Sequence, residues 1–231
     1  FSSNNLYEPE VQPEYYCYVL RNLSASETKE YKFTCSSRLS QDFAVATVGE
    51  QNDQNKQKYL FYITEREGYN IKSFKIEGEG GDFDDGTQHF TLGQISAICA
   101  KGDQLYIAIT ENNNYTTANI YTGIINEKGE LASFGENNQP DPILSLGISD
   151  FTAGAIQNSE FFNYAFAISD MYINGSKLYV TAGCVNYDGN SWNNNQDYRV
   201  YHSFGGLFVY ELEESGNLAK DDDGSITVES Y

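Results

Sequence analysis

The stretch Gly102-Asp-Gln-Leu-Tyr-Ile-Ala-Ile-Thr110 decides the fold of this chain, because two other segments repeat its pattern. The copies are Gln57-Lys-Tyr-Leu-Phe-Tyr-Ile-Thr64 and Gly175-Ser-Lys-Leu-Tyr-Val-Thr181. In each copy a polar turn leads into Leu and an aromatic or β-branched run that ends in Thr. Such a run is typical of a β-strand that is buried on both faces. Three copies of one strand predict a repeat protein built of sheets.

Each copy belongs to a group of four candidate strands separated by segments rich in Asn, Gly and Asp. The groups are 44–48, 59–64, 71–76 and 88–92; then 95–100, 104–110, 119–125 and 131–134; then 167–173, 177–183, 206–212 and 225–230. No segment has the three-to-four-residue apolar spacing of an amphipathic helix. The interval from Leu60 to Leu105 suits a four-stranded propeller blade of ~40–45 residues. The sequence therefore predicts an all-β fold of antiparallel β-propeller blades, about three of them full, at 42–92, 94–134 and 164–231.

The second and third groups also match each other without a gap. Gly205-Gly-Leu-Phe-Val-Tyr-Glu-Leu-Glu-Glu-Ser-Gly-Asn-Leu218 aligns with Ala118-Asn-Ile-Tyr-Thr-Gly-Ile-Ile-Asn-Glu-Lys-Gly-Glu-Leu131, so that strand, Gly turn and Leu recur in register. Between these groups the chain is longer by an insertion at 135–163, which contains Pro140 and Pro142. We expect the insertion to pack on one rim as a long loop with a short helix or strand.

The first residues look different from the repeats. Residues 1–13 are polar, carry Pro9 and Pro13 and are interpreted as an N-terminal arm. Two candidate strands at 15–20 and 29–34 then form a leading hairpin, the outer half of a partial blade at 14–36. Since a closed radial array takes ~4 to 8 blades, we expect the propeller segment, 14–231, to belong to a larger propeller. It would pair with a complementary segment, with another chain or with a second copy of itself.

Charge narrows the classes of partner. Asp and Glu number 33 against 14 Lys and Arg, for a formal net charge of −19, which repels phosphate backbones and anionic lipid surfaces. Nucleic-acid binding and membrane insertion are therefore not expected, and no run approaches the ~20 apolar residues of a membrane helix. Many Tyr and Asn and few basic residues favour an extracellular or cell-surface protein, with the periplasm as alternative. Any signal or lipoprotein anchor would lie outside this segment.

The four cysteines show no CxxC and no metal-ligand spacing with the two histidines. Cys17 and Cys35 flank the leading hairpin, and they form either a disulfide or two buried free thiols. Cys99 lies in a predicted inner strand, where it is interpreted as a small core hydrophobe.

Oxygen-rich loops raise the question of calcium, which takes six to eight oxygen ligands. The loop 186–197 offers Asn186, Asp188, Asn190 and Asp197, but only two of these are charged. The favoured interpretation is an Asn-rich turn with no cofactor, and calcium is the alternative. Asp221-Asp-Asp-Gly224 lacks a first ligand and is interpreted as a structural turn.

Aromatic residues near loops form a second candidate site. They are Tyr115, Tyr187, Trp192, Tyr198 and Tyr201. Tyr and Trp are enriched at binding hot spots, although aromatics on sheets also serve as packing. We weigh both roles, recognition surface and rim packing, for this set.

Two segments, Lys177-Leu-Tyr-Val-Thr-Ala182 and Gly206-Leu-Phe-Val-Tyr-Glu-Leu212, resemble the YVTN and lactonase-like β-propeller repeats of bacterial proteins. The resemblance covers about 60 to 70% of the chain in repeats of blade length. It implies blade architecture, in a superfamily with both sugar-lactone hydrolases and non-catalytic surface propellers. His89 and His202 lie in no GxSxG or HExxH setting, and no catalytic residue is assigned. We therefore expect a non-catalytic module that binds protein as part of a larger assembly, with a lactonase-like hydrolase as alternative.

Overall fold

The computed structural model describes the backbone of residues 15–21, 29–35, 39–49, 56–64, 70–76, 87–91, 94–110, 117–131, 141–147, 150, 164–187 and 200–230. These residues are almost all in strands and tight turns, as the period of the sequence predicts. Described side chains lie within these ranges, in 42–49, 56–63, 71–73, 75–76, 94–110, 117–131, 141–147, 150, 166–184 and 205–229.

The strands form three four-stranded antiparallel sheets and one hairpin. Sheet 1 contains β3 (Leu39–Val48), β4 (Gln57–Thr64), β5 (Asn70–Lys75) and β6 (Thr87–Thr91) in that order. Sheet 2 contains β7 (Gln94–Lys101), β8 (Gln104–Thr110), β9 (Thr117–Ile124) and β10 (Leu144–Gly147). Sheet 3 contains β11 (Tyr164–Asn174), β12 (Lys177–Tyr187), β13 (Val200–Glu211) and β14 (Val228–Ser230). The hairpin pairs β1 (Tyr15–Arg21) with β2 (Lys29–Cys35).

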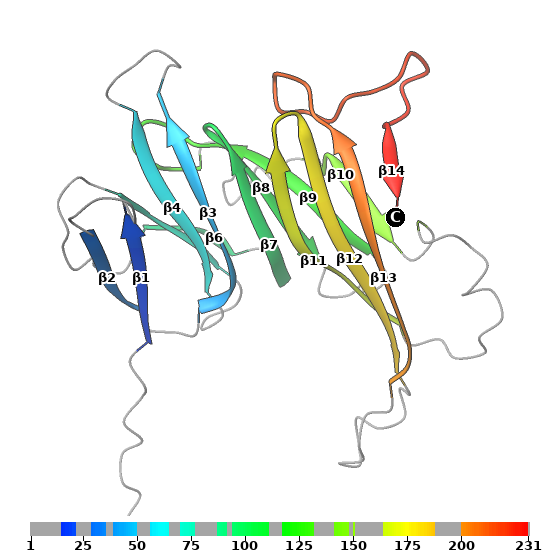
Figure 1. Cartoon of the computed structure of the whole chain (residues 1–231), viewed down its shortest axis with the longest axis horizontal. Helices are drawn as coiled ribbons and strands as arrows, with labels where there is room; N and C mark the ends of the chain where they lie inside the picture. The colour runs from blue at the N-terminus through cyan, green and yellow to red at the C-terminus, as the bar shows by residue number, and fades with distance from the viewer. Residues whose placement is uncertain are drawn as a thin grey trace, which may run out of the picture.

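The sheets follow one another in chain order, with the first strands of the three sheets, β3, β7 and β11, side by side (Figure 1). A backbone hydrogen bond from Thr47 N to Gly102 O, 2.8 Å long, ties sheet 1 to sheet 2. The three sheets form an open stack and do not close into a ring (Figure 1). We call the face of a sheet that points toward the following sheet its forward face, and the opposite face its rear face.

Two hydrophobic clusters hold the stack together. One joins the forward face of sheet 1 to the rear face of sheet 2, and the other joins the forward face of sheet 2 to the rear face of sheet 3. Sheet 2 is thus covered on both sides, and every residue from Leu105 to Thr110 is buried. The prediction that this strand is buried on both faces is confirmed, and its bounds agree with the predicted 104–110.

The ungapped match between the second and third groups is confirmed by the strand register. Leu105 pairs with Gly123, and Leu178 pairs with Tyr210, the residue aligned with Gly123. After each strand an isolated bridge closes the same turn, Ile125 to Leu131 in sheet 2 and Leu212 to Leu218 in sheet 3.

Two details of the predicted elements are wrong. The fourth strand of sheet 2 is β10, within the predicted insertion, and not 131–134. Leu131 makes only the bridge that closes a turn, whereas Leu144 pairs with Ile120 in the sheet. His202 was expected in a loop, but β12 and β13 extend well past the predicted strands and place it opposite Asn186.

In the hairpin, Cys17 lies opposite Phe33 and Cys35 opposite Tyr15. The two cysteines are therefore diagonal neighbours across the strands, where Cα atoms stand ~7–8 Å apart, and not direct partners. Their side chains lie outside the described residues, so the disulfide stays a prediction. Cys99 is buried as a free thiol, in agreement with its expected role in the core. The described residues include no helix long and apolar enough to span a membrane.

Candidate functional site

A tyrosine of sheet 1 reaches a turn of sheet 2. The Tyr59 hydroxyl on β4 lies 2.7 Å from the carbonyl oxygen of Glu127, in the turn that follows β9. Ser73 on β5 donates to the carbonyl oxygen of Gly129 in the same turn, at 3.3 Å. These contacts fix sheet 2 against sheet 1 at the outer part of the stack.

A similar contact, to a different carbonyl of the corresponding turn, joins sheets 2 and 3. The Tyr106 hydroxyl on β8 donates to the carbonyl oxygen of Gly216, at 2.6 Å, in the turn that follows β13. Burial raises the pKa of Tyr106, so this hydroxyl stays protonated and able to donate. We call this arrangement the tyrosine–turn contact.

The turns that receive the tyrosines share one backbone conformation. In each turn the backbone N–H of the first residue donates to the carbonyl oxygen of the fifth. Asn126 N donates to Glu130 O, and Glu213 N donates to Asn217 O, both at 2.9 Å. The fourth residue is a glycine with positive φ, 79° at Gly129 and 82° at Gly216. A Cβ at Gly129 would overlap the ring of Tyr59, so glycine also lets the tyrosine approach.

A third tyrosine stands at the same position of sheet 3. Tyr179 follows Leu178 on β12 as Tyr106 follows Leu105 on β8. Its neighbours Leu178 and Val180 pack against sheet 2, so Tyr179 points from the forward face. Beside it lies Tyr172 of β11, with ring centroids 6.4 Å apart. The Tyr179 hydroxyl makes no hydrogen bond to any described side chain or backbone group.

The forward faces of sheets 2 and 3 differ in what covers them. On sheet 2, Tyr106 is 0% exposed because sheet 3 lies over it. On sheet 3, Tyr172 is 64% exposed and Thr181 is exposed as well. The forward face of sheet 3 therefore has a tyrosine at the same position as the forward face of sheet 2, but it is exposed at Tyr172 and Thr181.

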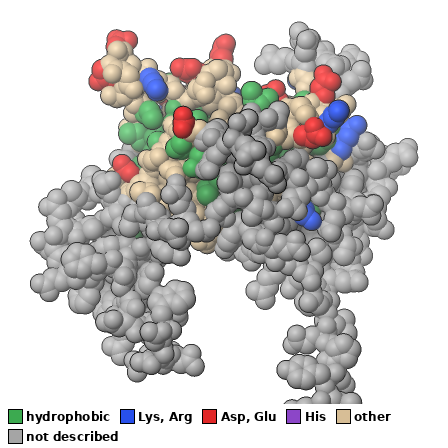
Figure 2. Space-filling view, turned by 180° about the vertical axis from the view of Figure 1, so that it is seen from behind, with side chains coloured by type: hydrophobic (Ala, Val, Ile, Leu, Met, Phe, Trp, Pro, Cys, Tyr) green, Lys and Arg blue, Asp and Glu red, His purple; other side chains and the backbone are tan. Residues whose placement is uncertain are grey.

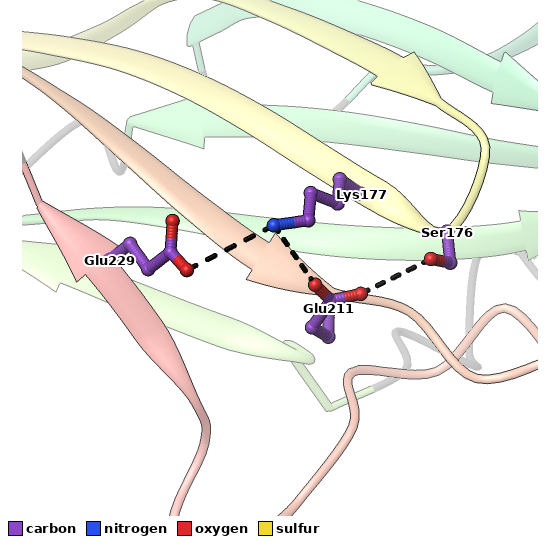
Figure 3. Close-up of polar contacts among 4 residues, drawn as sticks. All are labelled: Ser176, Lys177, Glu211 and Glu229. Atoms are coloured by element: carbon purple, nitrogen blue, oxygen red, sulfur yellow. Dashed lines mark hydrogen bonds and ion pairs between the residues drawn. The ribbon is translucent and has the colours of Figure 1, made fainter.

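A polar cluster borders this open face (Figure 3). Lys177 Nζ lies 3.2 Å from Glu211 Oε1 and 3.9 Å from Glu229 Oε1, and Ser176 donates to Glu211 Oε2 at 3.2 Å. The hydrogen bond to Glu211 is the main cause that raises the pKa of Lys177, followed by the charge of Glu229. The lysine side chain is thereby held across three strands of the sheet.

The first strands of sheets 1 and 3, β3 and β11, carry two aspartates that no sequence motif marks. Asp42 Oδ1 accepts the N–H of Phe43 at 2.8 Å, and Asp42 Oδ2 accepts the N–H of Ile98 in sheet 2 at 2.7 Å. Burial raises the pKa of Asp42, the two backbone hydrogen bonds oppose this, and the charge of Asp170 adds to the increase. Asp170 has the same local bond, from Met171 N to Oδ1 at 2.8 Å.

The rear face of sheet 1 is open along β3. Phe43 is 66% exposed and Val45 is 45% exposed, whereas Ala44 and Ala46 between and beyond them pack toward sheet 2. The stack thus has an exposed apolar strip at each end, at Tyr172 on sheet 3 and along β3 on sheet 1. On the same face of β4, Leu60 and Tyr62 are buried, so the strip on sheet 1 is limited to β3. Figure 2 shows acidic side chains along the upper rim of the described part, with hydrophobic side chains visible between them.

Most residues of the two predicted sites lie outside the described part. This holds for Tyr115, Trp192, Tyr198, Asp188, Asn190 and Asp197. Asn186 and Tyr187 lie on β12 and Tyr201 lies on β13, where only their backbone is described. The structure therefore leaves both sites as predictions.

Asp221 begins a turn that is closed by its own hydrogen bonds. Gly224 N donates to Asp221 O at 2.8 Å, and Ser225 N donates to Asp223 Oδ1 at 2.9 Å. That hydrogen bond is the largest cause that lowers the pKa of Asp223. Among the described residues, no group of three acidic, His or Cys side chains is placed to hold a metal ion.

Comparisons of this chain with models of protein families, with curated proteins and with solved structures find no match.

Proposed function

We propose that the three sheets are successive blades of a β-propeller, and that the protein is an extracellular or cell-surface module that binds another protein. The observation that carries the proposal is the repetition of one sheet-to-sheet contact. Tyr59 and Tyr106 each reach the glycine turn after the third strand of the following sheet, at the carbonyl of Glu127 and of Gly216, and the first strands of all three sheets run side by side. Blades in a radial array pack on their neighbours in this manner.

Binding of protein is supported by the apolar strips at the two ends of the stack. Tyr172, Phe43 and Val45 are large side chains that point to solvent from regular strands. Aromatic side chains on an open face are the groups that carry most of the energy in protein interfaces. A net charge of −19 favours partners other than nucleic acid or anionic membranes.

Lactone hydrolysis, the alternative function, gains no support from Asp42. Both carboxylate oxygens of Asp42 accept backbone N–H groups, and one of these bonds links two sheets. Such a carboxylate serves to align strands.

A binding experiment tests the proposal. The immobilised chain would be exposed to the extracellular fraction of its source organism, beside the variants Tyr172→Asp and Ile124→Asp. Ile124 is 55% exposed on sheet 2 and belongs to neither open strip, so it serves as the matched control. We expect one protein to be retained by the native chain and by Ile124→Asp but not by Tyr172→Asp. Equal retention by all three baits would contradict the proposal.

A further inference from the structure

We infer that the forward face of sheet 3 binds the guanidinium group of an arginine that belongs to the protein partner. The inference rests on the proposed function and names the chemistry by which that partner is recognised. The site consists of four side chains in two register pairs, Asp170 opposite Thr181 and Tyr172 opposite Tyr179. Met171 is buried against sheet 2, so its neighbours Asp170 and Tyr172 point from the forward face. We call these four residues the tyrosine–aspartate patch.

The patch differs from the face of sheet 2 that sheet 3 covers. The corresponding positions of sheet 2, found through the strand register, are small and buried between the two sheets: Ala97, Cys99 and Ala108. Sheet 3 has an aspartate, a tyrosine and a threonine there instead. A further sheet packed equally closely would meet the larger ring of Tyr172 and bury the charge of Asp170, both of which are unfavourable. The patch therefore suits a polar, cationic group better than another sheet.

The carboxylate of Asp170 is oriented by the backbone and has one oxygen open. Met171 N donates to Asp170 Oδ1 at 2.8 Å, whereas Oδ2 makes no hydrogen bond to a described residue. The Thr181 hydroxyl lies 3.0 Å from Ser169 Oγ and 3.4 Å from the Asp170 carbonyl oxygen, at the β-bulge from which the aspartate projects. A carboxylate held in this way can accept a charged donor with little further loss of side-chain entropy.

The two tyrosines supply the ring surface on which a cation packs. Tyr172 is 64% exposed, and its ring centroid lies 6.4 Å from that of Tyr179, with the ring planes 42° apart. Val209, opposite Tyr179 on β13, is buried, so the open surface is limited to β11 and β12. Residues two apart on a strand stand ~7 Å from each other on one face, which brings a group on the Tyr172 ring within reach of the Asp170 carboxylate.

The charge of the surrounding face favours a cation. The charged side chains described on the strands of sheet 3 are one lysine and three carboxylates: Lys177, Asp170, Glu211 and Glu229. Lys177 is held by the two glutamates, at 3.2 Å and 3.9 Å (Figure 3). No described lysine or arginine side chain forms an ion pair with Asp170. The patch therefore carries a carboxylate whose charge no described cation balances.

Among cationic side chains, arginine matches this arrangement best. Its guanidinium group is planar, stacks on a tyrosine ring and directs several N–H donors from its edge, whereas the lysine ammonium is a strongly hydrated point charge. A guanidinium group on the ring of Tyr172 has two acceptors beside it, Asp170 Oδ2 and the Tyr179 hydroxyl. Arginine is also enriched in protein interfaces, where it carries much of the binding energy.

Titration with small probes tests the site on the full chain. The ¹⁵N-labelled chain would be titrated with N-acetyl-arginine amide, with the lysine analogue and with N-acetyl-citrulline amide, which has the shape of the arginine probe without its charge. We expect the arginine probe to cause saturable shifts of the amide signals of Tyr172 and Thr181, and the citrulline probe to cause none. Equal affinity for the lysine probe, or equal shifts with citrulline, would overturn the inference.

Matched variants separate the patch from the general acidity of the chain. Asp170→Asn should weaken binding of the arginine probe about tenfold, because one charge-assisted hydrogen bond is lost. Asp103→Asn removes the same charge from an exposed turn of sheet 2 and should have no such effect. Tyr172→Ala should weaken binding more than Tyr172→Phe, which keeps the ring. Equal effects of Asp170→Asn and Asp103→Asn would contradict the site, and circular dichroism checks that each variant folds.

The partner itself is tested by adding Asp170→Asn and Asp103→Asn to the baits of the binding experiment. We expect the retained protein to be lost with Asp170→Asn and kept with Asp103→Asn, and to be eluted by the arginine probe but not by the citrulline probe. Retention that survives Asp170→Asn and is lost with Tyr172→Asp would show an apolar contact alone and would overturn the inference.

The two proposals fail in different ways. A chain that retains another protein but binds no arginine probe would remove the arginine site and leave the protein-binding module in place. A chain that binds the arginine probe but retains no protein would remove the proposed function, while the guanidinium site itself would stand.

Discussion

Tyr106 and Tyr179 occupy equivalent positions of successive sheets, and among the described residues only Tyr106 has a hydrogen-bond partner for its hydroxyl. Tyr106→Phe leaves the buried carbonyl of Gly216 without its donor, which costs ~1–3 kcal/mol of unfolding free energy. Tyr179→Phe removes no hydrogen bond to a described residue and should leave that free energy unchanged. Urea denaturation of both variants beside the native chain measures the two changes. Equal effects of the two variants would contradict the tyrosine–turn contact.

Asp42 gives a prediction about pH. Its pKa is raised in the folded chain above the ordinary value of 3.8, first because of burial. Above pH 3.8 the folded state therefore holds more protons at this carboxyl than the unfolded state, and its contribution to stability falls as pH rises through the interval up to the folded pKa. We expect the unfolding free energy of the native chain relative to Asp42→Asn to decrease over that interval. A difference that grows with pH would show the opposite sign.

The contacts of Tyr106 and Asp42 could not have been predicted from the sequence. The run from Gln104 to Thr110 identifies a buried strand, but nothing local tells that Tyr106 bonds a glycine more than a hundred residues later. Asp42 precedes a predicted strand and looks like a solvated acid. Its role depends on the bulge in β3 between Ser40 and Phe43, and a bulge leaves no signal in apolar alternation.

The glycine turns allow a matched test at the level of an element. Gly216 and Gly224 both have positive φ, 82° and 84°, and each is the fourth residue of its turn. A Cβ at Gly216 would overlap Gln104 and approach the Tyr106 hydroxyl, whereas a Cβ at Gly224 meets nothing within 4 Å. Gly224→Ala should therefore lower the unfolding free energy only by the ~1 kcal/mol that a left-handed backbone costs a residue with a Cβ. Gly216→Ala should lower it clearly more. Thermal unfolding of both variants measures the difference.

The elements were predicted well where the pattern is long and regular. The strand Gln104–Thr110 and the aligned turns that end in Leu131 and Leu218 follow from apolar runs and glycine placement. The fourth strand of sheet 2 was misplaced because Leu144–Gly147 is only four residues long and follows two prolines. Leu131 is apolar and buried like a strand residue, but it makes one isolated bridge that closes a turn and it does not belong to a strand.

The net charge makes a prediction for the whole molecule. The formal charge of −19 repels itself in the compact folded chain, and salt screens that repulsion over ~10 Å at 0.1 M. We therefore expect the melting temperature of the chain to rise between 20 mM and 300 mM salt. Calorimetry across this range measures the melting temperature. A melting temperature that falls with salt would point to attraction between opposite charges.

At the same scale, three antiparallel four-stranded sheets follow from the sequence, because each strand group repeats with its own turns. Whether such sheets close into a ring does not follow from it. Closure depends on the angle between neighbouring sheets and on what covers the last face, and neither is encoded in the alternation of apolar residues.

The tyrosine–turn contact has a direction, since each sheet gives the tyrosine and the following sheet gives the glycine turn. Sheet 2 holds both parts, Tyr106 at one strand and Gly129 at its turn. An in-frame duplication of the gene segment for this sheet would therefore create a junction in which the first duplicate's tyrosine meets the second duplicate's glycine turn. Arrays of different length could in this way arise by recombination alone, without a new interface having to evolve.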